Sequence, residues 1–333
     1  MTPTQILVVI VNYRTPDLTS AAVAAIRPEI MERGDVHIVI ADNASGDGSP
    51  AMLEAAVREL GLSERCSVLS LDDNLGFAAG NNAAIAFHRN MVRSDASPSL
   101  IWLLNPDTVA QPGALAALVD FMVANPRAGI IGGRCLWPDG QIRRSAFRFP
   151  SPFSELLASL DLGLLNRLFS GCRVPMPIID TPYQTDWVGG SHLMLRGEVY
   201  DRLGSIDEGY FLYFEETDYC ARAAAAEIER WHVPASTIVH IGGQATGVTG
   251  DIRPTERRPR YWFASRARFF LKRYGAVRTH LANLLWLLFY PPGFALALLR
   301  GRPRQDPPKL WRDFLGHYYG RGGLMYRPGE LIR

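Results

Sequence analysis

An Asn-Pro-Asp tripeptide ends a short apolar run in the first third of the chain. Five apolar residues occupy positions 100–104, and Asn105 and Asp107 follow them on either side of Pro106. Such a run, stopped by a turn signal, is typical of a strand buried on both faces. The oxygens of Asn105 and Asp107 could bind a divalent cation, which could in turn hold a diphosphate. The tripeptide is equally a good turn sequence, so a turn without a ligand remains an alternative.

A second group with possible chemistry is the acidic cluster at residues 215–218, which contains Glu215, Glu216 and Asp218. On a helix Glu215 and Asp218 would share a face, whereas Glu216 would point elsewhere. Nearby like charges raise the pKa of one member, which would suit it to abstract a proton as a general base. The alternative is a solvated helix N-terminus, where the helix dipole favours acidic residues.

The segments that must position these groups alternate in character. Apolar runs predict strands at residues 6–11, 36–41, 67–71 and 99–104, and the segments between them predict helices. This alternation is typical of a three-layer, mostly parallel α/β sheet. Polar residues follow the first, second and fourth strands, so they should converge on one crevice at the carboxyl edge of the sheet.

The pattern changes after Gly129. We expect a strand and hairpin around residues 132–141, an apolar helical segment at 153–169, and two short strands at 231–233 and 237–239. The helical segment could form a lid or a face for a partner.

Composition and charge limit the classes of protein. The 333 residues are 47% apolar and 20% charged, enough for one large domain or two. Residues 253–333 contain 17 Lys and Arg against 4 Asp and Glu, net +13, whereas the rest of the chain carries −11. A basic tail suggests an anionic partner, either a membrane surface or a nucleic acid. Its segment 281–299 is apolar, but Pro291 and Pro292 disfavour a straight transmembrane helix.

Two further features bear on the cellular compartment. The four cysteines lie far apart in the sequence and match no zinc or disulfide framework, so reduced thiols are expected. The first five residues lack a charged n-region, which favours a first strand at 6–11 over a signal peptide.

Several motifs occur together in an order that resembles the family 2 glycosyltransferases of the GT-A fold. The closest subgroup looks like the rhamnosyltransferases that extend bacterial cell-wall or surface polysaccharides. The resemblance covers roughly residues 5–245, and the segment 240–247 and the arginine-rich helix after it also look like that subgroup. The motifs are Asn12-Tyr13, Asp42-Asn43-Ala44-Ser45, Asn74-Leu75-Gly76-Phe77 with Asn81, Asn105-Pro106-Asp107, Trp187-Val188-Gly189-Gly190 and Glu215-Glu216-Thr217-Asp218.

The resemblance implies a Rossmann-like, mostly parallel sheet flanked by helices in a nucleotide-sugar domain over residues 1–250. It leaves a basic and apolar helical region at 251–333, which would contact the membrane surface or another subunit. The expected activity is inverting, metal-dependent transfer of a sugar, with rhamnose from dTDP-rhamnose as the expected donor and a lipid-linked saccharide as the acceptor. A UDP-sugar is the other donor considered. The enzyme would act at the cytoplasmic face of the membrane, with a homo-oligomer possible and no nucleic-acid partner expected.

The donor site is assigned by the same resemblance. Asp42 would accept the imide N–H of uracil or thymine, or else would only cap its turn. Gly76 and Gly80 would let the backbone approach the phosphates at a helix N-terminus. The predicted substrate-binding residues are Asn12, Tyr13, Asp42, Asn43, Asn74, Gly76, Phe77, Asn81, Asn105, Trp187, Gly189 and Gly190.

The metal ligands and the general base are assigned from the remaining motifs. Asp107 would bind Mn²⁺ or Mg²⁺, with Asn105 nearby where many relatives carry Asp, and His240 would complete the site by resemblance. Imidazole suits Mn²⁺ better than Mg²⁺, although His240 could instead be a hydrogen-bonded strand-end residue. In the family pattern Glu-Asp-x-Asp the second acid is the general base, and here that position is Glu216, with Glu215 and Asp218 beside it.

Two other classes of function are considered. A nucleotidyltransferase shares the α/β architecture, but it would require a glycine-rich basic N-terminal loop that residues 12–15 do not provide. A catalytically inactive scaffold at the membrane is the other alternative, and hydrolysis of a nucleotide sugar with Mn²⁺ would distinguish it from an enzyme.

Overall fold

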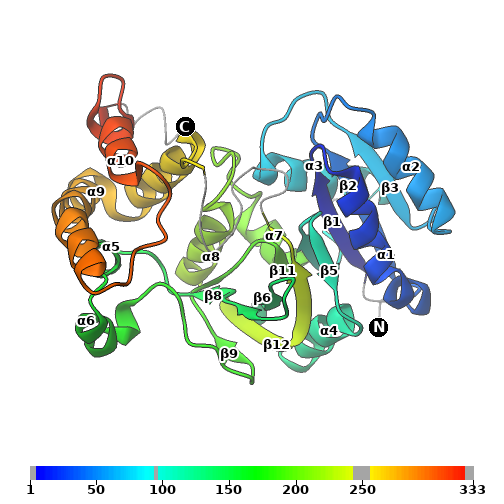
Figure 1. Ribbon diagram of the computed structural model, residues 1–333. Coiled ribbons are helices and arrows are strands. Elements are labelled where there is room, and N and C mark those ends of the chain that lie inside the picture. Colours follow the sequence, from blue (N-terminus) through cyan, green and yellow to red (C-terminus); the bar gives the residue numbers. More distant parts are fainter. Residues whose placement is uncertain (1–4, 94–96, 243–255, 327–333) are drawn as a thin grey trace. The chain divides into compact units, whose positions relative to one another are not determined.

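A computed structural model describes residues 5–93, 97–242 and 256–326 (Figure 1). The chain divides into two compact units. The first comprises Met1–Phe147, Pro177–Glu208 and Glu215–Ala245, and the second comprises Arg148–Met176, Gly209–Phe214 and Thr246–Arg333. The second unit thus includes residues 148–176 as well as the C-terminal region, whereas the sequence predicted a single boundary near residue 250.

The first unit is built on a mixed sheet whose main path runs in the order β3-β2-β1-β4-β11-β6-β12-β5. β7 pairs with β6, β9 pairs with β12, and a separate antiparallel pair joins β8 and β10. The strands are β1 (Ile6–Asn12), β2 (Val36–Asp42), β3 (Cys66–Ser70), β4 (Leu100–Leu104), β5 (Thr108–Ala110), β6 (Ala128–Leu136), β7 (Ile142–Arg143), β8 (Ala146–Phe147), β9 (Tyr183–Gln184), β10 (Trp187–Val188), β11 (His192–Arg196) and β12 (Glu229–His240).

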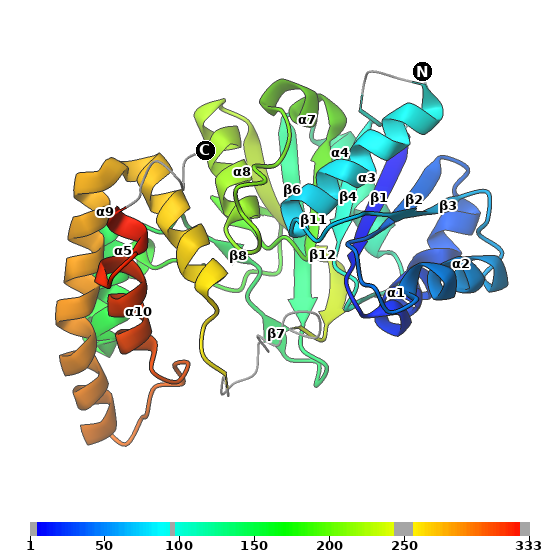
Figure 2. The same ribbon diagram turned by 90° about the horizontal axis from the view of Figure 1, so that it is seen from above.

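Helices cover both faces of this sheet, as Figures 1 and 2 show. They are α1 (Pro16–Glu32), α2 (Ser49–Glu59), α3 (Phe77–Val92), α4 (Ala114–Ala124), α7 (Gly197–Leu203) and α8 (Glu215–Ala225). One core joins α1, α2 and α4 to alternate residues of the central strands, such as Ile6, Val8 and Ile10 of β1. The side chains between them face the opposite side, because successive residues of a strand alternate. The predicted mostly parallel α/β sheet is therefore confirmed.

Gly80 of α3 lies on that opposite side, against β1. A Cβ at this position would come within 2.8 Å of Cγ1 of Val11, closer than real side chains approach. Gly80 therefore allows the helix to pack directly on the strand. The sequence placed it with Gly76 at the phosphates, but its close contact is with the sheet.

One long strand replaces the two short ones predicted at residues 231–233 and 237–239. β12 runs continuously from Glu229 to His240 and pairs in parallel with β6, with a shift of register between Val233 and Thr237. Pro234 has no N–H for the ladder, so a local bulge accommodates it while the strand continues. The continuity carries His240 to the same edge of the sheet as the ends of β1 and β2.

The second unit is helical. Its elements are α5 (Pro152–Leu160), α6 (Gly163–Leu168), η1 (Ser170–Cys172), α9 (Arg260–Leu299), α10 (Leu310–Tyr319) and η2 (Leu324–Tyr326). The predicted helical segment at 153–169 is thus two helices, separated at Asp161, whose φ of 46° lies in the left-handed region. Aromatic residues of α9 and α10, including Phe263, Trp286, Phe314 and Tyr318, form the core of this unit.

A buried arginine ties three of these helices together. Arg266 of α9 is 2% exposed and pairs with Glu155 of α5 at 2.6 Å. It also donates to Asn283 Oδ1 at 2.8 Å and to the Tyr318 hydroxyl of α10 at 3.3 Å. Although burial alone would lower the pKa of Arg266, the charges and hydrogen bonds of Glu155 and Tyr318 raise it above its ordinary value. This side chain therefore stays charged and acts as a structural cross-link.

The break in α9 is not where the sequence predicted it. The helix continues through Pro291 and Pro292, and its non-helical residue is Gly275, at φ 71° and ψ 175°. A proline inside a helix leaves the carbonyl four residues earlier without its usual donor. For Pro291 that carbonyl belongs to Leu287, and the indole N–H of Trp311 donates to it at 2.9 Å. α10 thus satisfies the acceptor that Pro291 leaves open, and this contact helps the helix to continue.

Candidate active site

The strand order brings the predicted site residues to one edge of the sheet. β1, β2 and β4 run parallel, so Asn12, Asp42 and Leu104 end at the same edge. β11 lies antiparallel beside β4, so its first residue, His192, starts there, and the backbone N–H of Asn105 donates to the Ser191 carbonyl at 3.1 Å. β12 ends at this edge with His240. Ligands bind at the carboxyl ends of strands in open α/β sheets, and we therefore place the candidate site here.

At one end of this edge Asp42 is fixed by hydrogen bonds from two neighbours. Its Oδ1 accepts from Asn12 Nδ2 at 2.7 Å and from Ser45 Oγ at 2.6 Å, and its Oδ2 accepts from the Ser45 N–H at 3.1 Å. Asp42 is 2% exposed. A carboxylate offers about four acceptor positions, so Oδ2 retains capacity for one more donor. The sequence did not single out the hydroxyl of Ser45 as the residue that orients this carboxylate.

An amide network continues from Asp42 toward α3. Asn43 Nδ2 donates to Asn74 Oδ1 at 2.8 Å and to the Gly76 carbonyl at 3.1 Å, and Asn74 Oδ1 also accepts from the Gly76 N–H. Asn81 Nδ2 donates to the Phe77 carbonyl at 2.8 Å. The side-chain oxygens of Asn43 and Asn81 are buried and have no hydrogen-bond partner in the described part of the chain. Orphaned buried acceptors deserve an explanation, and donor groups of a ligand could satisfy them.

Tyr13 and Phe77, two other predicted substrate-binding residues, are each partly exposed. The guanidinium of Arg14 lies 5.1 Å from the centre of the Tyr13 ring, and its Nε donates to the Ser45 carbonyl at 3.0 Å. Tyr13 is therefore held beside the Asp42 network, in reach of the same ligand.

The predicted metal ligands Asp107 and His240 lie side by side. His240 Nε2 is 3.2 Å from Asp107 Oδ1, and both side chains are nearly buried. Burial acts to raise the pKa of Asp107, but the hydrogen bond and charge of His240 and the charge of Arg143 hold that pKa below its ordinary value. A third residue, Arg143, lies on the other side of His240, with its Nη1 3.2 Å from His240 Nδ1. The sequence did not single out Arg143.

The Asp107–His240 pair fits part of a cation site. Two ligands each about 2.1 Å from one octahedral ion lie roughly 3 Å apart, close to the separation observed here. Among the described residues no group of three or more His, Cys, Asp or Glu side chains is arranged to hold a metal. The remaining coordination would have to come from substrate oxygens, water or Asn105.

Glu215 and Glu216 open α8, and both have raised pKa values. Burial raises the pKa of Glu216 to about 7, against the lowering effect of hydrogen bonds from backbone N–H groups, including that of Gly190. Burial and then the charge of Glu216 raise the pKa of Glu215 well above its ordinary value. Glu215 is 5% exposed, whereas Glu216 is the more exposed of the two. One carboxylate oxygen of each has no hydrogen-bond partner among the described residues.

Asp218, the third acid of the cluster, has a structural partner. Its Oδ2 is 3.3 Å from Nε of Arg222, one turn further along α8. Arg222 also donates to the carbonyls of Leu203 and Ser205, each at 2.8 Å. Asp218 therefore orients an arginine that fastens α8 to the residues around the end of α7.

The Trp187-Val188-Gly189-Gly190 segment lies next to this acidic pair. Trp187 stacks on Phe147 with ring centres 4.2 Å apart, and Gly189 N–H donates to the Ser145 carbonyl at 3.1 Å. A Cβ on Gly190 would sit 3.5 Å from Cβ of Glu216. The segment is thus fixed on one side by β8 and Ser145, and it lies against the candidate base on the other.

Behind it lies a buried polar network that the sequence did not predict. The Trp102 indole donates to His192 Nδ1 at 3.0 Å, and His192 Nε2 is 2.8 Å from Ser236 Oγ. Burial lowers the pKa of His192 to about 3, so the ring is neutral. The network links β4, β11 and β12 directly below the edge that carries Asn105 and His240.

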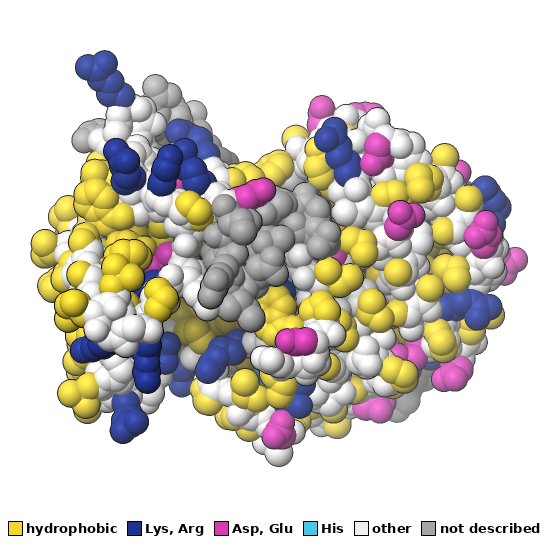
Figure 3. Space-filling view, viewed as in Figure 1, with side chains coloured by type: hydrophobic (Ala, Val, Ile, Leu, Met, Phe, Trp, Pro, Cys, Tyr) yellow, Lys and Arg dark blue, Asp and Glu magenta, His cyan; other side chains and the backbone are white. Residues whose placement is uncertain are grey.

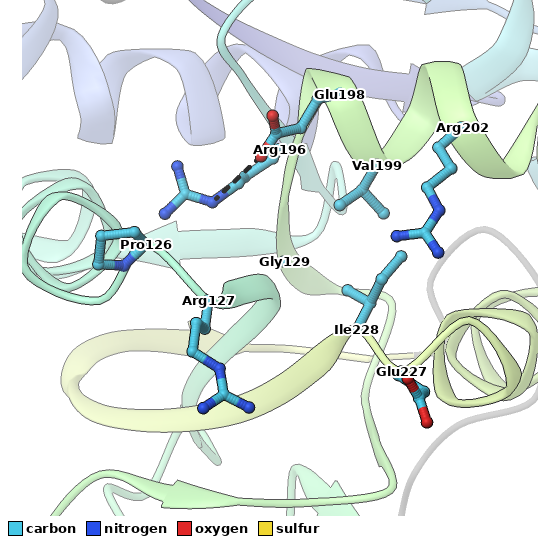
Figure 4. A pocket seen from close by; sticks show the side chains of 9 residues that line it. All are labelled: Pro126, Arg127, Gly129, Arg196, Glu198, Val199, Arg202, Glu227 and Ile228. Atoms are coloured by element: carbon cyan, nitrogen blue, oxygen red, sulfur yellow. Dashed lines mark ion pairs between the residues drawn. The ribbon is translucent and has the colours of Figure 1, made fainter.

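A pocket of about 390 Å³ lies elsewhere in the first unit, and none of the predicted site residues lines it (Figure 4). Three of its lining residues are the arginines Arg127, Arg196 and Arg202. Arg196 donates to the carbonyls of Ala128, Met122 and Asn125, so it caps the end of α4. Arg127 pairs with Glu229 at 2.9 Å. These roles are structural, and the pocket is separate from the candidate active site.

The fold is of the GT-A class. The structure resembles the mannosyltransferase PcManGT from Pyrobaculum calidifontis, solved with GDP-Man and Mn²⁺, with a TM-score of 0.50 and 16% identity over 98% of this chain and 85% of that one. It also resembles GalNAc-T7, solved with UDP, GalNAc and Mn²⁺, with a TM-score of 0.50 and 14% identity over 81% of this chain and 50% of that one.

Sequence comparison gives the family. Residues 7–170 match glycosyl transferase family 2. The chain is 30% identical to the N-acetylglucosaminyl-diphospho-decaprenol L-rhamnosyltransferase of Mycobacterium tuberculosis over 69% of this chain and 72% of that protein. It is 28% identical to the rhamnosyltransferase WbbL of Escherichia coli over 50% of this chain and 60% of that protein. The chain belongs to glycosyl transferase family 2, which confirms the predicted family and enzyme class.

Part of one predicted motif cannot be placed. Residues 243–247 of the segment that begins at His240 lie outside the described residues.

Proposed function

We propose that this protein is an inverting, metal-dependent rhamnosyltransferase that moves rhamnose from dTDP-rhamnose to a lipid-linked saccharide. Its membership of the family supports sugar transfer. The names of the two rhamnosyltransferase relatives support rhamnose, and that of the mycobacterial relative supports an acceptor on a polyprenyl diphosphate. The observation that carries the proposal is Glu216, a carboxylate with a pKa raised to about 7 and one unpartnered oxygen, beside the Gly189-Gly190 segment.

The reaction follows from what this carboxylate can do. Glu216 takes the proton of an acceptor hydroxyl, and the oxygen forms a bond to the anomeric carbon from the face opposite the diphosphate. The bond between that carbon and the diphosphate oxygen breaks, and its electron pair leaves with the nucleoside diphosphate. A single displacement of this kind inverts the anomeric configuration. Burial and the charge of Glu216 raise the pKa of the neighbouring Glu215 well above its ordinary value, and we assign the role of base to the more exposed Glu216.

Asp107 and His240 would hold Mn²⁺ or Mg²⁺, which when bound supplies positive charge to the leaving diphosphate. Their spacing and their carboxylate and imidazole donors suit one cation. Asn105 contributes a neutral side chain at the same turn, so the protein brings a single carboxylate to this pair of positions. Oxygens of the donor's phosphates would be among the ligands that complete the site.

The other end of the sheet edge would bind the nucleoside. Asp42, with one acceptor position left on Oδ2, would receive the imide N–H of thymine. The unpartnered oxygens of Asn43 and Asn81 supply further acceptors. The distribution is consistent with a donor that lies along the edge, with its base at β1 and β2 and its diphosphate at β4 and β12.

We further propose that the second unit attaches the enzyme to the cytoplasmic face of the membrane. Beyond Gly275, α9 presents an exposed apolar stripe of Val277, Leu281, Leu284 and Leu288, with side chains 51–83% exposed. Their spacing of four, three and four residues puts them on one face of the helix. Figure 3 shows hydrophobic side chains gathered over this part of the molecule, with Lys and Arg side chains near them. A solvent-facing stripe of this length requires an apolar partner.

The opposite face of α9 determines the mode of attachment. In the described part of the chain α9 is the one helix long and apolar enough to cross a membrane, by length and composition alone. Trp286 of that helix stacks on Phe314 of α10 with ring centres 4.2 Å apart, so one side is already covered by protein. This favours a helix lying in the plane of the interface over one that spans the bilayer.

Not every cation of the basic tail is available to a membrane. Arg266 and Arg268, which belong to this tail, are 2% and 5% exposed. Lys272, Arg273 and Arg278 remain exposed at one end of the stripe. Each basic residue near an anionic leaflet contributes about 1 kcal/mol, so these add to the apolar contact without replacing it.

The experiment that tests the proposed activity offers the purified protein dTDP-rhamnose, UDP-N-acetylglucosamine or GDP-mannose, with a short polyprenyl diphosphate N-acetylglucosamine as acceptor and Mn²⁺. We expect a product larger by one deoxyhexose from dTDP-rhamnose, with the anomeric configuration opposite to that of the donor by NMR. Transfer from another donor would change the assigned sugar, and retention of configuration would exclude the single displacement. Glu216→Gln serves as the inactive control.

A further inference from the structure

Arg143 stands beside the candidate metal pair, and the proposed reaction has not yet used it. It belongs to β7, where it pairs with Cys135 of β6. Its Nη1 is 3.2 Å from His240 Nδ1, and its guanidinium lies 4.4 Å from the centre of the Trp137 ring. The stacking on Trp137 holds the planar group in place. No carboxylate forms an ion pair with Arg143 among the described residues.

The charges at this part of the edge indicate what Arg143 could bind. Asp107 and Arg143 have opposite charges, and Asn105 is neutral, so these three side chains are together close to neutral. A nucleoside diphosphate brings two to three negative charges, and one divalent cation next to Asp107 does not balance them all. The fork of donors on a guanidinium matches two phosphate oxygens at once. Within the described part of the chain, Arg143 is thus a cation that forms no ion pair with a carboxylate, at the position where the donor's diphosphate is expected.

The histidine contact explains how Arg143 is held ready. His240 Nε2 faces the carboxylate of Asp107, to which its N–H donates, so Nδ1 has the lone pair that accepts from Arg143. An imidazole nitrogen is a weaker partner for a guanidinium than an anionic oxygen, so a phosphate group close by would take its place.

We propose that Arg143 is a donor-binding residue that contacts the diphosphate of the nucleotide sugar, with His240 as its partner before the donor arrives. The inference rests on the proposed function, because it takes a nucleoside diphosphate as the ligand. It adds a protein cation to the diphosphate site. Position 105 carries a neutral Asn in place of a carboxylate, and Arg143 adds a positive charge. Both features reduce the negative charge around the leaving group.

Binding measurements test this without turnover. Calorimetric titrations with dTDP and with thymidine, in the presence of Mn²⁺, separate contacts to phosphate from contacts to the nucleoside. For Arg143→Ala we expect the dissociation constant of dTDP to rise at least about tenfold, the size of one lost charge-assisted interaction. The dissociation constant of thymidine should change less than about twofold, and Arg143→Lys should recover part of the loss for dTDP.

The neighbouring Arg144, which is exposed on the same hairpin, provides the matched control. Arg144→Ala removes the same charge and should leave dTDP binding within about twofold of the wild type, and melting temperatures without ligand should report an intact fold for each variant. Equal affinity of wild type and Arg143→Ala for dTDP would overturn only the role of Arg143. Equal losses for dTDP and thymidine would also overturn it. If the wild type binds neither dTDP nor UDP, the proposed donor class and this inference are both wrong.

Discussion

Gly190 lies against Glu216, because a Cβ on this glycine would come 3.5 Å from Cβ of Glu216, and the backbone N–H of Gly190 acts to lower the pKa of the carboxylate. This joins the segment after β10 to the first turn of α8, two places 26 residues apart in the sequence. The contact places the carboxylate beside the Gly190 backbone, and its Oε2 has no hydrogen-bond partner among the described residues. A fixed carboxylate with a free oxygen and a raised pKa is suited to accept a proton from an acceptor hydroxyl.

Replacing this carboxylate by an amide should remove the base and keep the shape. For Glu216→Gln we expect kcat to fall by at least about 10²-fold, because a general base contributes roughly 10²–10⁴-fold. The dissociation constant of dTDP should stay near that of the wild type in calorimetry. Glu215→Gln is the matched control, with a much smaller loss of kcat. If Glu215→Gln or Asp218→Asn shows the large loss instead, another acid of the cluster is the base.

The pH dependence should report the same group. Burial raises the pKa of Glu216 to about 7, and only the ionised form can take a proton. The wild-type kcat should therefore rise with pH up to about 7 and decrease by up to tenfold per unit below it. A stopped assay from pH 5.5 to 8.5 measures the profile, and the residual activity of Glu216→Gln should lack this step. A flat wild-type profile between pH 5.5 and 7 would contradict the assignment.

Asp107 is predicted to hold the cation that assists departure of the diphosphate. In Asp107→Ala, kcat should decrease at least about 10²-fold, because the cation that stabilises the leaving diphosphate loses a ligand. Mn²⁺ should also no longer tighten dTDP binding, which calorimetry with and without the metal can show. Asp139→Ala, at an exposed aspartate in the turn before Arg143, serves as the control for charge. Near wild-type turnover of Asp107→Ala at micromolar Mn²⁺ would remove the metal role.

Asp42 is predicted to affect the affinity for the donor more than it affects kcat. Asp42→Ala should raise the dissociation constant of dTDP about tenfold or more and leave kcat at saturating donor within a few-fold. Because Asn12 and Ser45 donate to this carboxylate, the substitution should also destabilise the fold by about 1–3 kcal/mol. Melting temperature and calorimetry must therefore be measured together. A lower melting temperature with unchanged dTDP affinity would make Asp42 a residue of the turn alone.

The apolar stripe on α9 is predicted to bind membranes. The wild type should float with vesicles that contain phosphatidylglycerol at low salt and should be partly released at high salt. The triple variant L281Q/L284Q/L288Q should lose flotation while keeping its melting temperature, because exposed substitutions change stability little. The control triple M31Q/M52Q/V123Q changes exposed apolar residues on α1, α2 and α4. If both triple variants lose flotation equally, or if the wild type does not float, the stripe is excluded as the membrane contact.

Local sequence predicted the framework of the first unit well. The segments that became β1 and β4 are unbroken apolar runs, those of β2 and β3 are largely apolar, and polar residues follow each of them, which is why both their existence and their order could be predicted. The polar ends at Asn12, Asp42 and Asn105 then follow from the parallel arrangement of those strands. In these segments the local pattern and the fold agree.

The predictions that failed depended on partners distant in sequence. Pro291 reads as a helix break, yet the helix continues, and the Trp311 indole satisfies the carbonyl that the proline leaves open. Arg266 belongs to the basic region that the sequence assigned to an anionic partner, yet Glu155, Asn283 and Tyr318 enclose it. These partners are not visible in the local pattern, because Trp311, Glu155 and Tyr318 lie on other helices of the unit and Asn283 lies beyond Gly275 in α9.

The sequence by itself determined the α/β class, the edge of the sheet that carries the polar residues, and the side chains available for chemistry there. Only the tertiary structure decided which of them meet. β11 inserts antiparallel between β4 and β6 and brings Gly190 to Glu216, and the continuous β12 delivers His240 to Asp107 and to Arg143 of β7. These contacts join residues 26 to 133 positions apart, and pairings over such distances are set by the packing of the whole sheet, which no local pattern encodes.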